Sequence, residues 1–221
     1  MQSRDRLIVA IDRSDRDDIL RLAEALDGAV GMLKIGLQAF IANGPSIVRE
    51  LDMPVFLDLK IHDIPNTAQH AVAEAAALGA EMVTVHAAGG GAMLRACAGA
   101  DTLVLGVTIL TSLDEHELRR VGFAAPPLDS AVRLAKLAKE SGLRVVVASP
   151  HEIRAIREAC RDLIIVAPGI RPAGSDAGDQ RRTMTPAAAV AAGADYIVVG
   201  RPITEAGKPR DAALAIAGSL P

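Results

Sequence analysis

Short hydrophobic runs alternate with longer amphipathic segments along the whole chain. The runs are rich in Val, Ile and Leu, as buried parallel strands are, and the segments between them are rich in Ala, Leu, Glu and Arg. We expect eight strands, at residues 7–11, 32–35, 55–59, 82–86, 103–108, 145–148, 163–167 and 196–200. Their average spacing is close to the roughly 30 residues that one strand-plus-helix unit needs.

The intervening segments carry the signals that begin and end helices. Ser14, Ser149 and Thr185 are expected N-caps, and Glu152 would complete a capping box with Ser149. A proline follows Ser149 and Thr185 directly, at the first helical position, where its missing N–H costs nothing. Helix-ending glycines are expected shortly before three of the strands, at Gly79, Gly142 and Gly193.

Eight strand-then-helix units predict the fold class. A chain of 221 residues is long enough for one (β/α)8 TIM barrel, whose usual size is about 250 residues with a lower limit near 200. No linker, charge block or close repeat divides the sequence, so we expect residues 1–221 to form a single domain. An open doubly wound sheet is the alternative, and the near-continuous hydrophobic strands favour the closed barrel.

Composition and charge exclude several classes of protein. The formal net charge of -3 gives no basic footprint for duplex nucleic acid, and aromatic residues at 2% are too few to stack single-stranded bases. No apolar stretch approaches the roughly 18 residues of a membrane span, and residues 7–11 are too short for a signal-peptide core. Cys97 and Cys160 form no pair or metal motif, so we expect free thiols and a reducing compartment, the cytoplasm.

Charged side chains gather at or just after the predicted ends of the first three strands. Asp12 follows the first strand, Lys34 lies in the second, and the third continues into Asp58, Lys60 and Asp63. Because residues two apart on a strand face the same side, Asp58 and Lys60 would both point into the mouth of the barrel. In TIM barrels this end of the strands carries the active site.

One reading of these charges is a structural layer of ion pairs. Apolar residues often serve equally well or better at buried positions, so stability alone gives little reason to gather so many charges. Alternating acids and bases keep the carboxylates ionised and the lysines protonated. Such an array would hold a substrate anion against Asp58 while Lys60 donates a proton, and we therefore favour a catalytic site.

A second concentration of candidate residues follows the last two strands. Residues 167–182 form a long Gly- and Pro-rich segment without apolar periodicity, which is typical of a functional lid. The final strand ends in Gly200 and Arg201. Loops after strands 7 and 8 of a barrel often bind phosphate, and arginine offers a planar fork of donors to its oxygens. Arg201 alone would read as a solvated surface residue; its place beside Gly200 and the lid favours a phosphate site.

The sequence DLKIHDIPNT at residues 58–67 closely resembles the core motif of the orotidine 5′-phosphate decarboxylase family. The segments PGIRP at 168–172, GDQRR at 178–182 and VGRPIT at 199–204 are similar to those of its bacterial members. DxKxxD alone also occurs in related sugar-phosphate decarboxylases, whereas its combination with the phosphate-loop segments is specific. The resemblance extends from Asp12 to Thr204 and implies a (β/α)8 barrel.

The resemblance also implies a reaction. Members of this family convert orotidine 5′-monophosphate to UMP and CO2, the last step of de novo UMP synthesis, without a metal or organic cofactor. By motif, Lys60 would protonate C6 of the pyrimidine as CO2 leaves, and Asp58 would stand against the substrate carboxylate. Lys34 and Asp63 would complete the charged network.

Substrate contacts and a partner are implied in the same way. Asp12 and Lys34 would contact the ribose hydroxyls, and Thr111, or its neighbour Ser112, would contact the pyrimidine. The family acts as a homodimer, in which Asp63 of each subunit, together with Thr67, would reach the active site of its partner. The remaining substrate-binding residues that the resemblance implies are Ile64, Thr67, Pro168, Arg171, Gln180, Gly200 and Arg201.

Two alternatives stay open on the sequence. A metal-dependent sugar-phosphate decarboxylase or aldolase of the same barrel superfamily shares DxKxxD, but it would need Mg²⁺ and a further acidic ligand. A catalytically silent nucleotide-binding barrel would need the phosphate loops without the costly charged array. The IPNT continuation of the core motif argues against the first, and the intact set of Asp58, Lys60 and Asp63 argues against the second.

Overall fold

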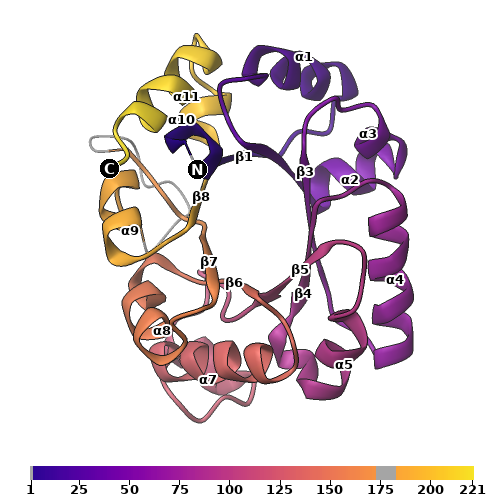
Figure 1. The fold of residues 1–221 in the computed structure, drawn as a ribbon, viewed down its shortest axis with the longest axis vertical. Coiled ribbons are helices and arrows are strands. Elements are labelled where there is room, and N and C mark those ends of the chain that lie inside the picture. The colour runs from indigo at the N-terminus through magenta and orange to yellow at the C-terminus, as the bar shows by residue number, and fades with distance from the viewer. Residues whose placement is uncertain (1, 173–182) are drawn as a thin grey trace.

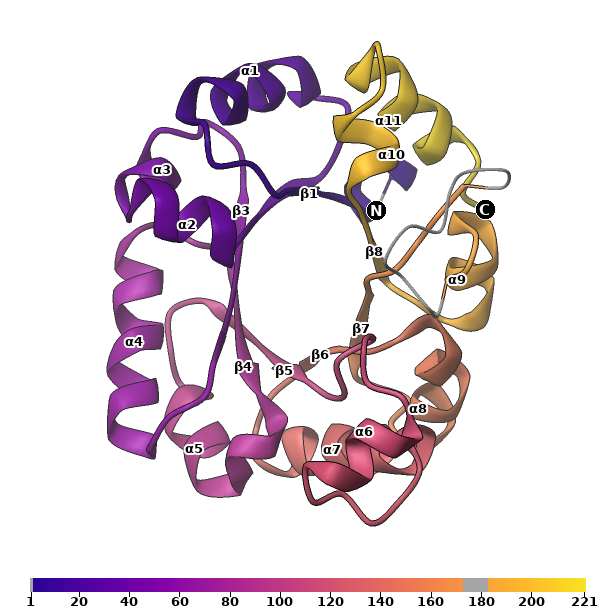
Figure 2. The same ribbon diagram turned by 180° about the vertical axis from the view of Figure 1, so that it is seen from behind.

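Eight parallel strands form a closed barrel with helices around it (Figure 1 and Figure 2). The computed structural model describes residues 2–172 and 183–221. Neighbouring strands pair in chain order, and β1 pairs with β8 to close the sheet. The barrel is confirmed and the open-sheet alternative is wrong. The strands are β1 (Leu7–Ile11), β2 (Met32–Gly36), β3 (Val55–Ile61), β4 (Met82–His86), β5 (Leu103–Val107), β6 (Val145–Val147), β7 (Ile164–Ala167) and β8 (Tyr196–Val199).

Helices cover the outer face of the barrel on all sides (Figure 1). No helix among the residues described combines the length and the apolar character that crossing a membrane would take. Short 3-10 turns lie at Ser3–Arg6, Ala87–Gly89 and Pro150–Glu152. The helices are α1 (Arg16–Leu26), α2 (Leu37–Asn43), α3 (Ser46–Arg49), α4 (Pro65–Ala77), α5 (Gly90–Cys97), α6 (Glu115–Arg120), α7 (Pro127–Glu140), α8 (Ile153–Ala159), α9 (Pro186–Ala192), α10 (Arg201–Thr204) and α11 (Pro209–Gly218).

The first helix begins at a different cap from the predicted one. Asp15, not Ser14, accepts the backbone N–H of Asp18, at 2.9 Å. The hydroxyl of Ser14 instead accepts a hydrogen bond from the side chain of Gln38, at 3.0 Å. Aspartate and serine are comparable N-caps, so the local sequence did not separate them. The cap at Thr185 is as predicted, and positive φ angles are found at the expected glycines, Gly79, Gly142 and Gly193.

The two faces of the barrel wall form two separate apolar clusters. Because side chains alternate along a strand, one set points outward against the helices and the other points into the barrel. The outer cluster includes Leu33 and Leu57, with Leu59 and Ile61 packed against it. The inner cluster draws on every strand and consists of Ile8, Ala10, Met32, Phe56, Met82, Leu105, Val145, Val166 and Val198.

At the next inward-pointing position along each strand, two residues further toward its C-terminal end, some of the side chains are polar. On the first four strands the side chains at this level are polar: Asp12, Lys34, Asp58 and Thr84. On the other four, the chain carries Val107, Val147, Pro168 and Gly200 at the equivalent step. The barrel therefore has an apolar floor, and the layer above it is polar on one side and apolar on the other.

The opposite, N-terminal end of the barrel is held by the side chain of Arg157 in α8. Its guanidinium donates to the carbonyls of Leu163 and Gly193, at 2.6 and 2.8 Å, and to the Asp195 carboxylate, at 2.6 Å. The same carboxylate accepts the backbone N–H of Ile165 at 2.8 Å. Arg157 thus connects α8 to the segments that enter β7 and β8. At Gly193 the φ of 112° favours glycine, and an added Cβ would lie 3.3 Å from Arg157 Nε.

Arg157→Ala is expected to lower the free energy of unfolding by about 2 kcal/mol, because it removes three hydrogen bonds from a charged group, to the carbonyls of Leu163 and Gly193 and to the Asp195 carboxylate. Urea denaturation followed by circular dichroism measures this change. The matched control is Arg154→Ala, one turn earlier on the same helix, where the side chain is exposed and the expected change is within about 0.5 kcal/mol. Equal stability of the two variants would contradict a structural role for the Arg157 contacts.

Candidate active site

A cavity of about 500 Å³ opens at the C-terminal ends of the strands, above the inner apolar cluster. This is the end at which TIM barrels carry their active sites. The structure brings many of the predicted site residues together on its wall, although their roles stay predictions. These residues are Asp12, Lys34, Asp58, Lys60, Thr111, Pro168, Arg171, Gly200 and Arg201.

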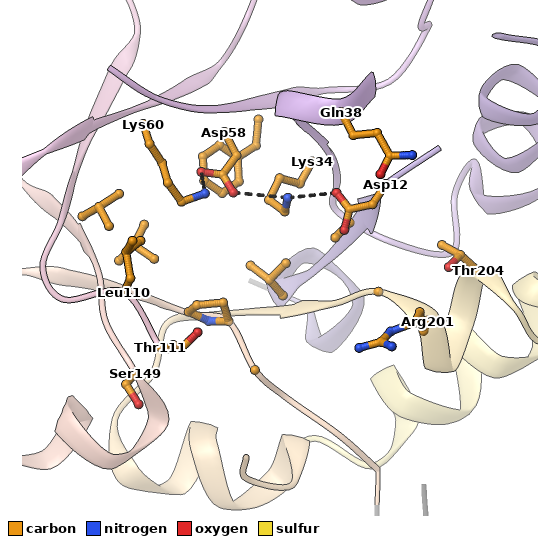
Figure 3. A pocket seen from close by; sticks show the side chains of 18 of the residues that line it. Asp12, Lys34, Gln38, Asp58, Lys60, Leu110, Thr111, Ser149, Arg201 and Thr204 are labelled. Carbon is orange, nitrogen blue, oxygen red and sulfur yellow. Dashed lines mark hydrogen bonds and ion pairs between the residues drawn. The ribbon is translucent and has the colours of Figure 1, made fainter. Parts of the chain in front are cut away.

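Four charged side chains form a continuous row along one wall of the cavity (Figure 3). Lys60 Nζ lies 2.8 Å from Asp58 Oδ1, and Lys34 Nζ lies 3.2 Å from Asp58 Oδ2. Lys34 Nζ also lies 3.7 Å from Asp12 Oδ1, so positive and negative groups alternate from β3 through β2 to the end of β1. The predicted alternation of acids and bases is therefore what the structure contains.

Asp58 is the electrostatic centre of this row. Its side chain is 13% exposed, and each of its carboxylate oxygens faces a different lysine. Burial by itself would raise the pKa of Asp58, but the charges of Lys34 and Lys60, with their hydrogen bonds, outweigh burial and hold that pKa below its usual value. Asp58 is therefore ionised at neutral pH, when no substrate is bound.

The strand that carries Asp58 and Lys60 departs from regular geometry between them. β3 and β4 pair at Leu57 with Val83 and again at Ile61 with Val85. The stretch 58–60 consequently lies opposite Thr84 alone, as in a β-bulge. Lys60 adopts a φ of 52°, and it is the one non-glycine residue with positive φ among those the structure describes. Both Asp58 and Lys60 face the cavity as predicted, but they reach it through a bulge and not through simple two-residue alternation.

Two histidines to which the sequence assigned no role lie next to this bulge. The ring of His86, at the end of β4, is 5.5 Å from that of His62, centroid to centroid. Burial lowers the pKa of His86, and His62 and Lys60 lower it further against the opposing effect of Asp58. His86 is therefore neutral at neutral pH and adds no positive charge to the row.

The wall across from the charged row carries cationic and neutral polar groups, and one acidic residue, Glu205, at the end of α10. Arg201 lies on this side in Figure 3, with Thr204 beyond it on the same helix. Arg171 follows β7 and also lines the cavity. Of the two candidates for a pyrimidine contact, Thr111 lines the cavity, whereas Ser112 is exposed and is not among the lining residues.

Several predicted site residues do not meet the others within this chain. Asp63, Ile64 and Thr67 are exposed, in the β3–α4 loop and the first turn of α4, and none of them lines the cavity. The Asp63 carboxylate accepts the backbone N–H of Ile64 at 2.7 Å. Gln180, like most of the predicted lid, lies outside the described residues.

The cavity also has lining residues that the sequence analysis did not select. Arg13 and Gln38 line it, and Arg13 donates to the carbonyl of Thr204 at 3.3 Å. Ser149 lies on its wall, and the predicted capping box with Glu152 is present: the backbone N–H of Ser149 donates to the Glu152 carboxylate at 3.1 Å. These residues follow directly after strands or at helix starts, but nothing in their residue type separates them from ordinary loop positions.

Thr84, next to the cavity wall, is a further residue that the sequence did not single out. It is fully buried, outside the cavity lining, and its hydroxyl bonds to both residues of the bulge. The signal that could have found it is the two-residue period that places it on the level of Lys34 and Asp58. Within residues 2–172 and 183–221, no group of three or more His, Cys, Asp or Glu side chains is placed to hold a metal ion.

Comparison with known proteins agrees with this geometry. The model of the family described as "Orotidine 5'-phosphate decarboxylase / HUMPS family" matches residues 5–216. Orotidine 5′-phosphate decarboxylase of Anaeromyxobacter dehalogenans is 50% identical, over 100% of both chains. The enzyme of that name from Moorella thermoacetica is 49% identical, over 100% of this chain and 94% of the relative.

A solved structure shows the same architecture. The crystal structure of orotidine 5′-phosphate decarboxylase from Lactobacillus acidophilus matches with a TM-score of 0.85 and 35% sequence identity, covering 96% of this chain and 97% of that chain. The likeness in sequence and in fold thus extends over nearly the whole barrel, including both walls of the cavity. This chain belongs to the orotidine 5′-phosphate decarboxylase / HUMPS family.

Proposed function

We propose that this chain converts orotidine 5′-monophosphate to UMP and CO2, without a metal or organic cofactor. The observation that carries the proposal is the row of Asp12, Lys34, Asp58 and Lys60 along one wall of a cavity that has Arg201 on the other. The names of the relatives support the same reaction. They do not favour the metal-dependent sugar-phosphate reaction of the wider superfamily.

The phosphate of the substrate binds on the side of Arg201. Arg201 and Gly200 follow β8, and Arg171 follows β7, which are the loops that bind phosphate in many barrels. Guanidinium groups offer paired donors to phosphate oxygens. We assign Gln180 to the same group of contacts by its motif. Binding energy gained at this remote group contributes to reaching the transition state at the ring.

The ribose and the base fill the space between the two walls. Asp12 and Lys34 lie at the end of the charged row nearer to Arg201, where they contact the ribose hydroxyls (Figure 3). Thr111 and Pro168 contact the pyrimidine from the other wall, and both line the cavity. This orientation directs C6 of the ring, with its carboxylate, toward Asp58 and Lys60.

The chemical step uses the charges of the bulge. The substrate carboxylate approaches Asp58, and repulsion between the two anions is relieved when the C6–carboxylate bond breaks and CO2 leaves. The electron pair of that bond stays on C6 and takes a proton from Lys60 Nζ. Lys60 then regains its proton from solvent. Lys34 keeps Asp58 ionised from its other oxygen throughout.

A second copy of the chain completes the site. Asp63 and Thr67 are exposed at the same end of the barrel as the cavity, and we assign them to the cavity of a partner subunit. Ile64 between them is 65% exposed, and Ile41 on helix α2 is 77% exposed. Apolar side chains this exposed gain stability when a partner covers them. Cys97 and Cys160 are both buried free thiols, in keeping with the reducing compartment that we propose, the cytoplasm.

Purified protein is expected to convert orotidine 5′-monophosphate to UMP at the same rate with and without EDTA. The change in ultraviolet absorbance measures the conversion. Loss of turnover with EDTA would instead support the metal-dependent alternative.

Lys60→Ala is expected to lower kcat by at least about 10²–10⁴-fold, the range typical of a lost general acid. Circular dichroism is expected to show that the variant keeps the fold. The matched control is Lys139→Ala, since Lys139 also pairs with an aspartate, Asp162, but lies outside the cavity.

Mixing two inactive variants tests the shared site. Lys60→Ala and Asp63→Asn are each expected to be inactive as homodimers. In a mixed dimer one site carries both substitutions and the other carries neither, so random mixing restores about a quarter of the wild-type sites. Co-refolding the two variants and assaying turnover measures the recovery. If the variants form dimers and no activity returns, Asp63 acts within its own subunit or not at all.

Asp58→Asn is expected to reduce the free energy of unfolding at neutral pH by about 3 kcal/mol, because it leaves two lysine ammonium groups without the carboxylate between them. The folded pKa of Asp58 is lowered, so its stabilising contribution is present above the unfolded pKa of about 3.9 and is lost as pH falls through the folded value. The difference between wild type and variant should therefore shrink below about pH 4. Urea denaturation across pH measures this.

Asp162→Asn is the control for this stability measurement. Asp162 also pairs with a lysine, Lys139, but on the surface, where an ion pair contributes little. An Asp58→Asn variant that is as stable as wild type at neutral pH would show that the two lysines do not depend on this carboxylate.

A further inference from the structure

Thr84 occupies an unusual position on β4. It is fully buried, it does not line the cavity, and it is the β4 residue opposite the break in β3. On β5 and β6 the equivalent inward-pointing position is occupied by valine, Val107 and Val147. These side chains fill the same layer of the barrel without a polar group. A buried hydroxyl costs stability unless it is hydrogen-bonded, so its bonds indicate why a threonine stands here.

The hydroxyl of Thr84 connects the two groups that we assign to the chemical step. It accepts the backbone N–H of Lys60 at 2.8 Å and donates its proton to Asp58 Oδ1 at 3.0 Å. Lys60 Nζ donates to the same Asp58 oxygen at 2.8 Å. Asp58, Lys60 and Thr84 are therefore linked in a closed ring of three hydrogen bonds. All three bonds involve only two oxygen atoms, Asp58 Oδ1 and the Thr84 hydroxyl.

The two hydrogen bonds of the Thr84 hydroxyl stabilise the irregular geometry of the bulge. The N–H of Lys60 would bond to a neighbouring strand in a regular ladder, and in the bulge it bonds to the Thr84 hydroxyl. A φ of 52° is unfavourable for lysine and persists only where surrounding contacts hold it. The bond to Asp58 Oδ1 fixes the rotation of the carboxylate, so that its second oxygen meets Lys34.

We propose that Thr84 is a positioning residue, whose hydroxyl holds the left-handed backbone of Lys60 and the carboxylate plane of Asp58 in the geometry that proton transfer to C6 requires. This role rests on the function proposed above for Asp58 and Lys60. Thr84 does not line the cavity, so it acts through these two residues and not on the substrate.

The test compares Thr84→Val, which keeps the branched shape and removes the hydroxyl, with Thr84→Ser, which keeps the hydroxyl. Thr84→Val is expected to lower kcat by about 10- to 100-fold, as for a lost hydrogen bond to a charged group, with a smaller change in KM. Thr84→Ser is expected to stay close to wild type. The matched control is Thr102→Val, since the Thr102 hydroxyl also bonds to one acceptor, the Ala80 carbonyl at 2.8 Å, outside the cavity.

The acid limb of the pH profile separates positioning from simple loss of folded protein. Removing a donor from ionised Asp58 raises the pKa of that carboxyl, so the acid limb of kcat/KM should move to higher pH in Thr84→Val. Partial unfolding would lower the amplitude of the profile without moving its limb. The charged or titratable groups around Asp58 are Lys34 on β2, Lys60 on its own strand and His86 on β4, and all three are retained in every variant.

A measurement that does not depend on turnover distinguishes failure of the role of Thr84 from failure of the proposed function. A carbon-13 NMR titration of the Asp58 carboxyl, assigned with Asp58→Asn, should show a higher pKa in Thr84→Val than in wild type and Thr84→Ser. Wild-type protein that leaves orotidine 5′-monophosphate unchanged would overturn the proposed function, while the titration would still test the bond to Asp58. Thr84→Val that matches Thr102→Val in kcat, pH limb and titration would overturn the role of Thr84. If Thr84→Val does not fold, the pair Thr84→Ala and Thr84→Ser gives the same comparison of hydroxyl absent and present.

Discussion

The carboxylate of Asp58 is the group on which the charged wall depends. Lys34 is buried and Lys60 is partly buried, and each is balanced by a different oxygen of the same carboxylate. Two ammonium groups this close to one another would repel strongly if nothing negative stood between them. The row therefore depends on Asp58, and its members come from the end of β1 (Asp12), from β2 (Lys34) and from β3 (Asp58 and Lys60).

The layered interior of the barrel explains why this unit can be built at all. The apolar cluster beneath it is complete, with a member from every strand, so the polar layer above does not have to supply the packing of the core. The N-terminal end is held separately by Arg157 and Asp195. Charges that would be unfavourable in the centre of the core are placed instead where one side faces a cavity open to water and substrate.

Much of the fold followed from the hydrophobic runs, because eight runs at strand-plus-helix spacing leave few alternatives to a barrel. The two-residue period of the third strand placed Asp58 and Lys60 on the cavity side. It did not predict the left-handed Lys60, since that conformation is held by Thr84, which is distant in sequence. The helix start near Ser14 was misplaced by one residue because two good capping residues adjoin each other there. Asp63 and Thr67 are motif residues whose proposed place lies in another subunit, which no pattern within one chain can position.

The apolar floor of the cavity determines by which end of the barrel a small molecule can leave. The side chains of the inner cluster fill the interior below the charged row, from Ile8 on β1 to Val198 on β8. Neither water nor a small gas molecule passes readily through an interior packed at the density of a protein core. In the reaction proposed above, carbon dioxide would form beside Asp58 and leave toward the C-terminal mouth, where the cavity opens. It would have to pass the bound nucleotide on its way out, so a mouth that admits the substrate must also leave a path around it for the smaller product.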